Sequence, residues 1–441
     1  MKPLEQPPAW KDDEIIKEGY KLFMDVAYKK IIDQINDKYL YWNKVKYTPN
    51  TGNISPEILW SAVKFSRSLY AKNLSFGRYN FHYNLTDFLQ KELHNFDVSI
   101  NGAWQENSFI PKEDKRRYLI SSIMEEAIAS SQIEGAVTTR EKAKDMLRKN
   151  MKPKNKSEQM ILNNFQTIKY IVANKDTDLT TATLFEIHRL ITHKTLDNQA
   201  DMGSYRTHNK INVVDAIDGE IVHVPPDYQE VEFLMNELFD FFNKNDEKQF
   251  IHPIVKASII HFMLGFIHPF VDGNGRTARA LFYWYLLKNA YWFTEYLSIS
   301  RFIAKTKTQY AKAYLYTEMD ENDLTYFIHY KVKMMKSAFE SLQAYILRKK
   351  DEKKQTVLFQ KMKGINERQA LILKWLNEDA NLLLTVKEIE NRFNVSNQTA
   401  RTDLYDLKEK GFLDLIDLNK KTKAFCRSEV FEEKILKEKK I

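Results

Sequence analysis

Proline and glycine are scarce in this chain, and their positions favour helices over most of its length. The last proline is Pro269, so residues 270–441 can form helices that no proline interrupts. The 441 residues include 12 glycines, whereas an average usage of about 7% would give about 31. Collagen-like, low-complexity and Gly/Ser-linked architectures are therefore excluded, and we expect a mainly α fold.

The composition is that of a globular protein that can bury a core, because 43% of the residues are hydrophobic and 29% are charged. The single cysteine, Cys426, excludes an intramolecular disulfide framework and a cysteine-rich zinc site. The sequence contains no run of about 18 apolar residues, and its beginning lacks the apolar stretch of a signal peptide. We therefore expect a cytoplasmic protein without membrane contact. The net charge of +8 permits nucleic-acid contact without requiring it.

Hydrophobic spacing divides the chain into four expected parts. They are an N-terminal helical region, a longer succession of helices, a charged helix or linker, and a compact C-terminal module. Their expected bounds are 1–114, 115–335, 336–363 and 364–441. The first part contains no motif with recognisable chemistry.

One segment within the second part breaks the helical pattern. Residues 211–226 carry β-branched side chains on both sides of Asp218-Gly219, and Pro225-Pro226 ends the segment. An Asp-Gly pair between such residues predicts a β-hairpin. A lone hairpin among helices is either a surface decoration or a flap over a site.

The C-terminal module has the pattern of a winged helix. Three amphipathic segments, of which Thr385 and Ser396 open the second and third and Gly411 closes the third, are followed by two extended segments. The third helix should expose Asn397, Gln398 and Arg401 at its start, where a recognition helix meets the major groove. However, residues 364–441 carry 15 basic and 14 acidic side chains. DNA and protein therefore both stay open as partners of this module.

The polar segment 268–279, which reads HPFVDGNGRTAR, lies between two almost wholly apolar helical segments. Gly273-Asn274-Gly275 can turn successive N–H groups toward an anion, and the helix that begins there adds its free N–H groups. Arg276 and Arg279 lie on one face of its first turn, and guanidinium groups match phosphate oxygens. These residues predict a site for more than one phosphate group.

Two further residues of this segment point to chemistry on such a phosphate. Asp272 supplies a carboxylate of the kind that holds Mg²⁺ together with substrate oxygens. His268 is the base of this segment that works near neutral pH. Together they indicate phosphoryl or nucleotidyl transfer to a hydroxyl group.

The segment resembles the signature of the Fic family, HPFx(D/E)GNGRxxR, at every fixed position. The resemblance covers about residues 115–330 and implies a Fic helical bundle with a β-hairpin flap, beside the N-terminal helical region and the C-terminal winged helix-turn-helix domain. It implies transfer of AMP from ATP to a Ser, Thr or Tyr hydroxyl of a target protein, including this chain itself. His268 would deprotonate the hydroxyl and Asp272 would hold Mg²⁺. The implied ATP-phosphate ligands are Gly273, Asn274, Gly275, Arg276 and, toward the γ-phosphate, Arg279.

The same resemblance assigns the hairpin and one aromatic residue. The hairpin resembles the flap that aligns the target segment by strand addition, with Ile221, Val222 and His223 at its edge. The segments GSYR, at 203–206, and HVPP, at 223–226, are also similar to the family. Tyr310 falls where the family places an aromatic residue near the adenine.

A second motif resembles the inhibitory pattern of the family, (S/T)xxxE(G/N). Ser130 and Glu134 are four residues apart on one helical face, so the hydroxyl can orient the carboxylate. Glu134 lies just before Gly135, at a helix end where the dipole disfavours an anion. The resemblance implies that Glu134 pairs with Arg279 and keeps ATP in an unproductive position.

Alternative functions remain beside this interpretation. Glu134 could instead orient a water for removal of AMP from a modified protein, or the chain could be a DNA-binding regulator that senses nucleotide. The intact His268 argues against a pure binding module, which needs no base. His188, His252 and His261 are expected to be core or capping histidines, and zinc-hydrolase and P-loop motifs do not occur. A homodimer is compatible with the sequence.

Overall fold

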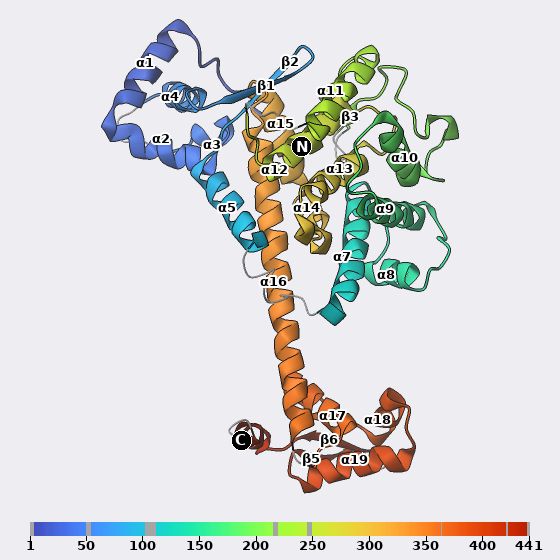
Figure 1. Cartoon of the computed structure of the whole chain (residues 1–441). Coiled ribbons are helices and arrows are strands. Elements are labelled where there is room, and N and C mark those ends of the chain that lie inside the picture. The colour runs from blue at the N-terminus through green and yellow to red at the C-terminus, as the bar shows by residue number, and fades with distance from the viewer. Residues whose placement is uncertain are drawn as a thin grey trace. The chain divides into compact units, whose positions relative to one another are not determined.

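The computed structural model describes residues 4–49, 54–101, 112–214, 219–244, 249–362, 364–419 and 422–438. Asp218 of the predicted hairpin turn and Lys420 and Lys421 of the predicted wing turn lie outside these residues. The described chain is predominantly helical, which confirms the predicted fold class (Figure 1). It divides into two compact units, Met1–Leu342 and Gln343–Ile441.

The first unit holds most of the helices. In chain order the longer ones are α1 (Asp13–Met24), α2 (Val26–Lys38), α4 (Pro56–Ser68), α5 (Asp87–Asn101), α7 (Lys112–Ile133), α8 (Arg140–Arg148), α9 (Lys156–Ala173), α10 (Thr181–Thr192), α11 (Val231–Asn243), α12 (Pro253–Ile267), α13 (Asn274–Lys288), α14 (Ile299–Lys305) and α15 (Lys307–Met319). The short ones are α3 (Trp42–Val45), η1 (Gln199–Asp201), η2 (Tyr228–Glu230) and η3 (Trp292–Tyr296). Helix α16 (Thr325–Lys361) begins in this unit and ends in the second. None of the described helices combines the length and the apolar character that crossing a membrane requires.

Helices α12 and α13 pack against each other and form the centre of the first unit. Helix α12 begins where the His252 side chain accepts a hydrogen bond from the N–H of Ile254, with Pro253 at the first helical position. Nearly every residue of both helices is buried, so neither has a polar face. The loop 268–273 between them is consequently held by the two best-buried elements of the unit.

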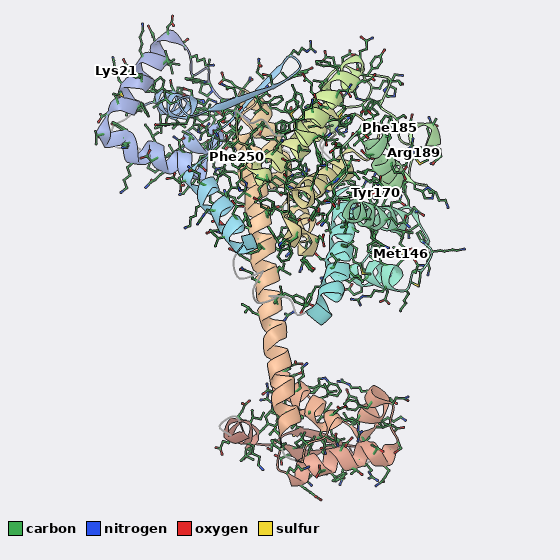
Figure 2. All side chains as sticks on the ribbon, in the orientation of Figure 1. Lys21, Met146, Tyr170, Phe185, Arg189 and Phe250 are labelled. Atoms are coloured by element: carbon green, nitrogen blue, oxygen red, sulfur yellow. The ribbon has the colours of Figure 1, made fainter. Side chains whose placement is uncertain are left out.

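Helix α7 is fixed against this centre from one side. It packs on α9 and α14, and the short helix α8 closes a small apolar cluster with Met146 buried between α7 and α9 (Figure 2). Deep in the contact, the buried carboxylate of Glu126 accepts hydrogen bonds from the Tyr283 hydroxyl at 2.7 Å and the Ser300 N–H at 2.9 Å. Burial raises the pKa of Glu126. These contacts fix the position of α7, and with it the position of its C-terminal end.

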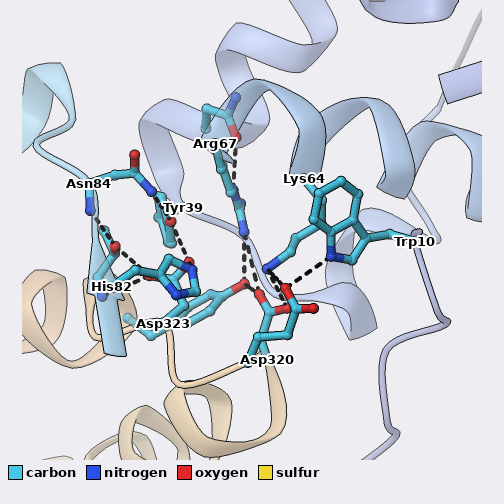
Figure 3. A network of polar contacts seen from close by, with 12 residues as sticks. Trp10, Tyr39, Lys64, Arg67, His82, Asn84, Asp320 and Asp323 are labelled. Atoms are coloured by element: carbon cyan, nitrogen blue, oxygen red, sulfur yellow. Dashed lines mark hydrogen bonds and ion pairs between the residues drawn. The ribbon is translucent and has the colours of Figure 1, made fainter. Parts of the chain in front are cut away.

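The N-terminal helices belong to the same compact unit and join it through a polar network (Figure 3). Lys64 Nζ of α4 lies 2.7 Å from Asp320 Oδ1, and both side chains are 2% exposed. The Tyr326 hydroxyl donates to Asp320 at 2.8 Å, and Arg67 donates to Tyr326 at 2.8 Å. In a second hydrogen bond of the network, the Tyr39 hydroxyl donates to Asp323 Oδ2 at 2.5 Å. The network thus ties α2 and α4 to the corner between α15 and α16.

The described strands of the first unit form two antiparallel pairs. Strand β1 (Lys72–Phe76) pairs with β2 (Tyr79–Tyr83), and β3 (Val213–Val214) pairs with β4 (Ile221–His223). The second pair has the predicted position of the hairpin, with an irregularity between Val213 and Val214.

The second unit has its own apolar core and the elements of a winged helix. They are α17 (Glu367–Glu378), α18 (Val386–Phe393), α19 (Asn397–Glu409), the antiparallel pair β5 (Leu413–Asn419) and β6 (Thr422–Arg427), and α20 (Phe431–Glu438). Thr385 and Ser396 cap α18 and α19 as predicted, and Gly411 has a φ of 74° directly after α19. Leu384 adds a short bridge to Phe425 of β6.

Candidate active site

His268 ends helix α12 in an unusual backbone conformation. Its φ of 49° and ψ of 58° lie in the left-handed region, which non-glycine residues adopt rarely and mostly where the surrounding structure holds them. Its N–H donates to Leu264 O at 3.0 Å, and its carbonyl accepts from Arg206 Nε at 2.9 Å. The backbone of this residue is therefore fixed from both sides.

The contacts of the His268 ring define its tautomer. Nδ1 lies 3.2 Å from the carbonyl oxygen of Gly265, which can only accept, so Nδ1 carries the hydrogen. Nε2 then keeps a free lone pair. Burial lowers the pKa of His268 to about 4, and the nearby charges of His223 and Arg206 act in the same direction. The ring is neutral at pH 7 and able to accept a proton.

Asn274 braces the loop from inside. Its Oδ1 accepts from the Phe270 N–H at 2.9 Å, and its Nδ2 donates to the Phe270 carbonyl at 2.8 Å. The side chain is thereby committed to the loop backbone, so a phosphate would have to meet the N–H of this residue. The predicted phosphate contact of Asn274 stays a prediction.

Gly273 and His188 hold the other end of the loop. Gly273 has a φ of 88°, and a Cβ there would lie 3.0 Å from Thr192 Cγ2, so glycine satisfies both backbone and space. His188, on α10, accepts from the Gly203 N–H at 2.9 Å and donates to the Asp272 carbonyl at 2.9 Å. As predicted, His188 is a buried core histidine, but it also orders the loop. Its contact with Asp272 was not predictable from an isolated histidine on an apolar helix.

Asp272 and Arg276 form an ion pair at the edge of the loop. Asp272 Oδ1 accepts from the Gly273 N–H at 2.6 Å, and Oδ2 lies 3.1 Å from Arg276 Nη2. Arg276 also donates to the Ile191 carbonyl at 3.1 Å and is only 1% exposed. These contacts show Arg276 orienting Asp272, and its predicted phosphate contact stays a prediction. Only Nε of its guanidinium lacks a partner among the described residues.

A single carboxylate suits a Mg²⁺ site that substrate oxygens complete. The Asp272 side chain is 52% exposed, and each of its oxygens keeps a free lone pair. Among the described residues, no group of three or more acidic, histidine or cysteine side chains could hold a metal alone. Asp272 therefore fits Mg²⁺ bound together with phosphates, which supply the remaining ligands.

Arg279 of α13 and Glu134 form the central ion pair of the site. Arg279 Nη2 lies 2.8 Å from Glu134 Oε1, and Nη2 and Nε also donate to the Ser130 carbonyl and hydroxyl at 3.0 and 2.8 Å. Burial opposes the charge of Arg279, but Glu134, Tyr310 and Glu126 together outweigh burial and raise the arginine pKa. Nη1 has no partner among the described residues. Ser130 acts on Glu134 through Arg279, a route that the four-residue spacing did not predict.

The end of α7 places the Glu134 carboxylate at the beginning of α13. A Cβ built on Gly275 would lie only 2.2 Å from Glu134 Oε1, so the carboxylate rests directly on this glycine. Gly135, with a φ of 89°, ends α7, and Ala136 N–H returns to Ser131 O at 3.0 Å. A negative group at a helix N-terminus is electrostatically favoured. Glu134 therefore occupies the place that suits a phosphate.

Lys307 holds the same end of α7 from α15. Its Nζ donates to the carbonyls of Gln132 and Ile133 at 2.7 and 3.2 Å, the residues directly before Glu134. A cation at a helix C-terminus is favoured by the dipole. No pattern in the sequence pairs Lys307 with the Gln132 carbonyl, 175 positions away.

A cavity of about 450 Å³ opens beside these groups. Its wall contains Ile133, Glu134, Val213, Val214, Val222, His223, Gly265, His268, Asn274, Gly275, Lys307, Thr308, Tyr310, Ala311, Tyr314, Leu315 and Glu318. The structure thus brings together around one cavity the predicted residues Glu134, Val222, His223, His268, Asn274, Gly275 and Tyr310. Among the described residues, the remaining predicted ones stand outside the lining: Ser130, Ile221, Asp272, Gly273, Arg276 and Arg279.

Aromatic residues of α15 form the apolar side of the cavity. The Tyr310 hydroxyl lies 2.8 Å from Nε2 of buried His261, and its ring packs against Tyr314 with centroids 5.4 Å apart. Burial raises the pKa of Tyr310. A mostly apolar, aromatic wall of this kind suits an aromatic base. The assignment of Tyr310 to adenine remains a prediction.

The hairpin covers the opposite side. Val222 and His223 line the cavity, whereas the Ile221 side chain is 58% exposed. Arg206, from the GSYR segment, links this hairpin to the catalytic loop, because its Nη2 donates to the Pro226 carbonyl and its N–H to the Pro269 carbonyl. The sequence marked the segment but not this role of its arginine.

Comparison with known proteins identifies both units. The Fic/DOC family profile matches residues 178–286, and a helix-turn-helix (HTH) domain profile matches residues 368–423. "Protein adenylyltransferase Fic" of Nematostella vectensis is 34% identical over 119 residues, 26% of this chain and 25% of that protein. Its namesake in Drosophila sechellia is 31% identical over 126 residues, 28% of this chain and 23% of that protein. The chain thus matches about a quarter of the length of either relative.

The fold is also similar to that of a solved structure. Fic-1 from C. elegans superposes with a TM-score of 0.51 at 18% identity, over 76% of this chain and 88% of that one. This likeness concerns the fold. The two profile matches show a Fic/DOC domain within residues 178–286 and a helix-turn-helix domain within residues 368–423, and the geometry of the loop 268–273 and the start of α13 agrees with the first of them.

Proposed function

We propose that this chain transfers AMP from ATP to a hydroxyl group of a protein, including itself, and that Glu134 inhibits this transfer. The observation that carries the proposal is the Glu134–Arg279 pair at the start of α13, in a cavity whose wall includes His268. The relatives named protein adenylyltransferase Fic support the reaction class.

His268 acts as the general base. The neutral ring takes the proton of the acceptor hydroxyl on Nε2 as the hydroxyl oxygen forms its bond to the α-phosphorus of ATP. The bond between that phosphorus and the bridging oxygen breaks, and pyrophosphate leaves. The low pKa of about 4 keeps the ring in its accepting form at neutral pH.

The first turn of α13 receives the phosphates. Its free N–H groups, including that of Gly275, and the buried guanidinium of Arg279 bind them, and the unpartnered Nη1 supplies one donor. Asp272 holds Mg²⁺, which neutralises phosphate charge when bound. Glu134 competes with the γ-phosphate for Arg279, so AMP transfer by the wild-type chain is slow.

Two variants test this function. Glu134→Gly and His268→Ala are incubated with Mg²⁺ and ATP labelled at the α-phosphate, alone and with cell lysate. We expect Glu134→Gly to label protein at least about tenfold faster than wild type. Adding His268→Ala should lower that rate about 10²- to 10⁴-fold. Asp197→Gly, which removes a fully exposed carboxylate, is the control and should behave as wild type.

The outcomes separate the reactions. If Glu134→Gly transfers no label to any protein, the AMP-transfer proposal is wrong. If wild type removes label from protein that the variant has modified, Glu134 serves the reverse reaction instead.

We also propose that the C-terminal unit binds DNA through α19. Asn397, Gln398 and Arg401 are exposed at the start of this helix, and the unit matches the HTH profile. The test is binding of a labelled duplex at low and physiological salt. Arg401→Ala should weaken binding at least fivefold, whereas Lys154→Ala in the other unit should not. No salt-dependent binding would contradict the proposal.

A further inference from the structure

Several side chains of the site bind the backbone carbonyls at the C-terminal end of α12. These side chains come from three segments of the chain. His268 Nδ1 lies 3.2 Å from Gly265 O, and His223 Nε2 lies 2.8 Å from Phe266 O. Arg206 Nε donates to the His268 carbonyl at 2.9 Å. The negative end of a helix favours cations, and Arg206 already supplies one.

His223 has hydrogen-bond acceptors on both sides of its ring. Nε2 faces the Phe266 carbonyl, and Nδ1 lies 2.7 Å from Glu318 Oε2 on α15. Neither acceptor can donate when Glu318 is ionised, so both contacts are hydrogen bonds only if the ring carries two hydrogens. The side chain is 8% exposed, so water does not compete easily for these positions. The geometry therefore favours the imidazolium.

The charges around His223 agree with this assignment. Burial alone would lower its pKa, but the Glu318 carboxylate and the Phe266 carbonyl outweigh burial and raise it. Arg206 and His268 are the other titratable groups that act on this ring, and Arg206 opposes its charge. The same positive ring helps to keep His268 neutral. One histidine of the cavity is thus built to be charged and the other to be uncharged.

Strand β4, which carries His223, belongs to a short ladder. Among the described residues the β3–β4 ladder consists of Val213 opposite His223 and Val214 opposite Ile221. Val214 and Ile221 are 53% and 58% exposed, so this pair of the ladder buries little surface. A pair of strands this short needs tertiary contacts to keep its position. The contacts of His223 connect this strand to the Phe266 carbonyl at the end of α12 and to Glu318 of α15, which lines the cavity.

We propose that His223 and Glu318 form an ionic latch that sets the position of strand β4 over the cavity and thereby aligns the acceptor hydroxyl with His268. The inference rests on the proposed AMP transfer for its consequence, but not for its geometry. His223 and Glu318 are positioning residues, because they act on the acceptor through the strand. The latch is closed while His223 is protonated. It loses one of its two bonds when the proton leaves at higher pH.

Hydrogen exchange of the full chain tests the latch without any activity. The readout is the protection of the backbone amides in 219–226, corrected for the intrinsic effect of pH. We expect Glu318→Gln and His223→Gln to exchange at least threefold faster there than wild type at pH 7. Wild type should approach the variants as the pH rises from 7 to 9.5. His193→Gln, an exposed histidine after α10, is the control and should exchange as wild type. Equal protection in wild type and Glu318→Gln would overturn the latch.

A second measurement links the latch to transfer. In the Glu134→Gly background, Glu318→Gln should lower the rate of self-labelling at saturating ATP at least fivefold and leave the KM for ATP within twofold. If Glu318→Gln only damaged the structure of the site, both the labelling rate and the KM for ATP would change. An unchanged rate would contradict the role in alignment, whatever the exchange data show. If the Glu134→Gly parent transfers no AMP, the proposed function fails while the exchange experiment still decides whether the latch exists.

Discussion

Glu134 and Arg279 lie 145 positions apart in the chain and 2.8 Å apart in space. The carboxylate is 33% exposed at the cavity and the guanidinium is 2% exposed behind it. Opening the pair therefore moves only the accessible partner, while the buried arginine stays in place through its contacts with Ser130. A ligand that brings its own negative charge to Arg279 can replace Glu134 at small structural cost. This asymmetry makes the pair suitable as a competitive inhibitor of phosphate binding.

Ser130→Ala should relieve inhibition only in part. The change removes the hydroxyl that accepts from Arg279 Nε at 2.8 Å but keeps the Ser130 carbonyl and Glu134. Arg279 then has more freedom, and the ion pair is less well aligned. We expect labelling from ATP at a rate between those of wild type and Glu134→Gly. Ser131→Ala, at a neighbouring buried serine that bonds within its own helix and to α9, is the control. A rate equal to that of the control would contradict the role of Ser130.

Lys307→Met should also raise basal transfer. The substitution removes the ammonium that caps the Gln132 and Ile133 carbonyls and keeps much of the side-chain volume. The last turn of α7 then frays more often and Glu134 leaves Arg279 more often. We expect a two- to tenfold increase in labelling. The neighbouring exposed Lys305→Met serves as the control. If Lys307→Met lowers the rate, Lys307 instead contacts the nucleotide.

Gly275→Ala separates the carboxylate from the phosphate. Its Cβ would fall 2.2 Å from Glu134 Oε1, the free end of a flexible side chain, so the protein can fold with Glu134 displaced. The same Cβ projects into the place proposed for phosphate. We therefore expect Gly275→Ala to lower ATP affinity at least tenfold in the Glu134→Gly background, measured by calorimetry. Unchanged affinity would place the phosphates elsewhere.

The sequence predicted the site as far as its residues are neighbours in the chain. The segment 268–279 could be recognised because the base, the glycines and the arginines lie within one short stretch of the chain. The pairing of Glu134 with Arg279 followed only from the resemblance to a family. Lys307 and Arg206 join distant segments through backbone carbonyls, which carry no sequence pattern, and Glu318 meets His223 from 95 positions away. For the same physical reason the bond from Arg276 to the Ile191 carbonyl could not be predicted, and its expected phosphate contact stays a prediction.

The rate of transfer should depend little on pH between 6 and 7.5. The lowered pKa of His268, about 4, keeps nearly all of the base neutral at pH 6. An imidazole with the ordinary pKa of about 6.5 would have lost about three quarters of its neutral form there. We expect the initial rate of Glu134→Gly at pH 6 to be at least 80% of that at pH 7.5, measured at constant ionic strength. A fourfold fall would contradict the buried, neutral base.

Stability should fall as the pH drops from about 6.5 to 4. Burial lowers the pKa values of His188 and His268 to about 4 and that of His329 to about 3. In this range the unfolded chain binds protons at these positions and the folded chain does not, so the free energy of unfolding rises with pH. Each histidine contributes at most about 1.4 kcal/mol per pH unit. Urea unfolding at pH 5 and 7 measures the slope, and His329→Gln should reduce it. An equal slope in the variant would contradict the contribution of His329.

The buried pair of Lys64 and Asp320 should be essential for the N-terminal helices to stay attached (Figure 3). Asp320→Asn leaves the buried ammonium with only the half-exposed Glu321 carboxylate, at 3.6 Å, and breaking a buried pair costs about 3–5 kcal/mol. Lys64→Met/Asp320→Leu removes both charges and should cost less than either single change. Calorimetry of the full chain gives the Tm of each variant. Lys21→Met removes an exposed pair with Glu18 and, as the control, should shift stability by less than about 1 kcal/mol. If Asp320→Asn behaves like that control, the network does not stabilise the junction.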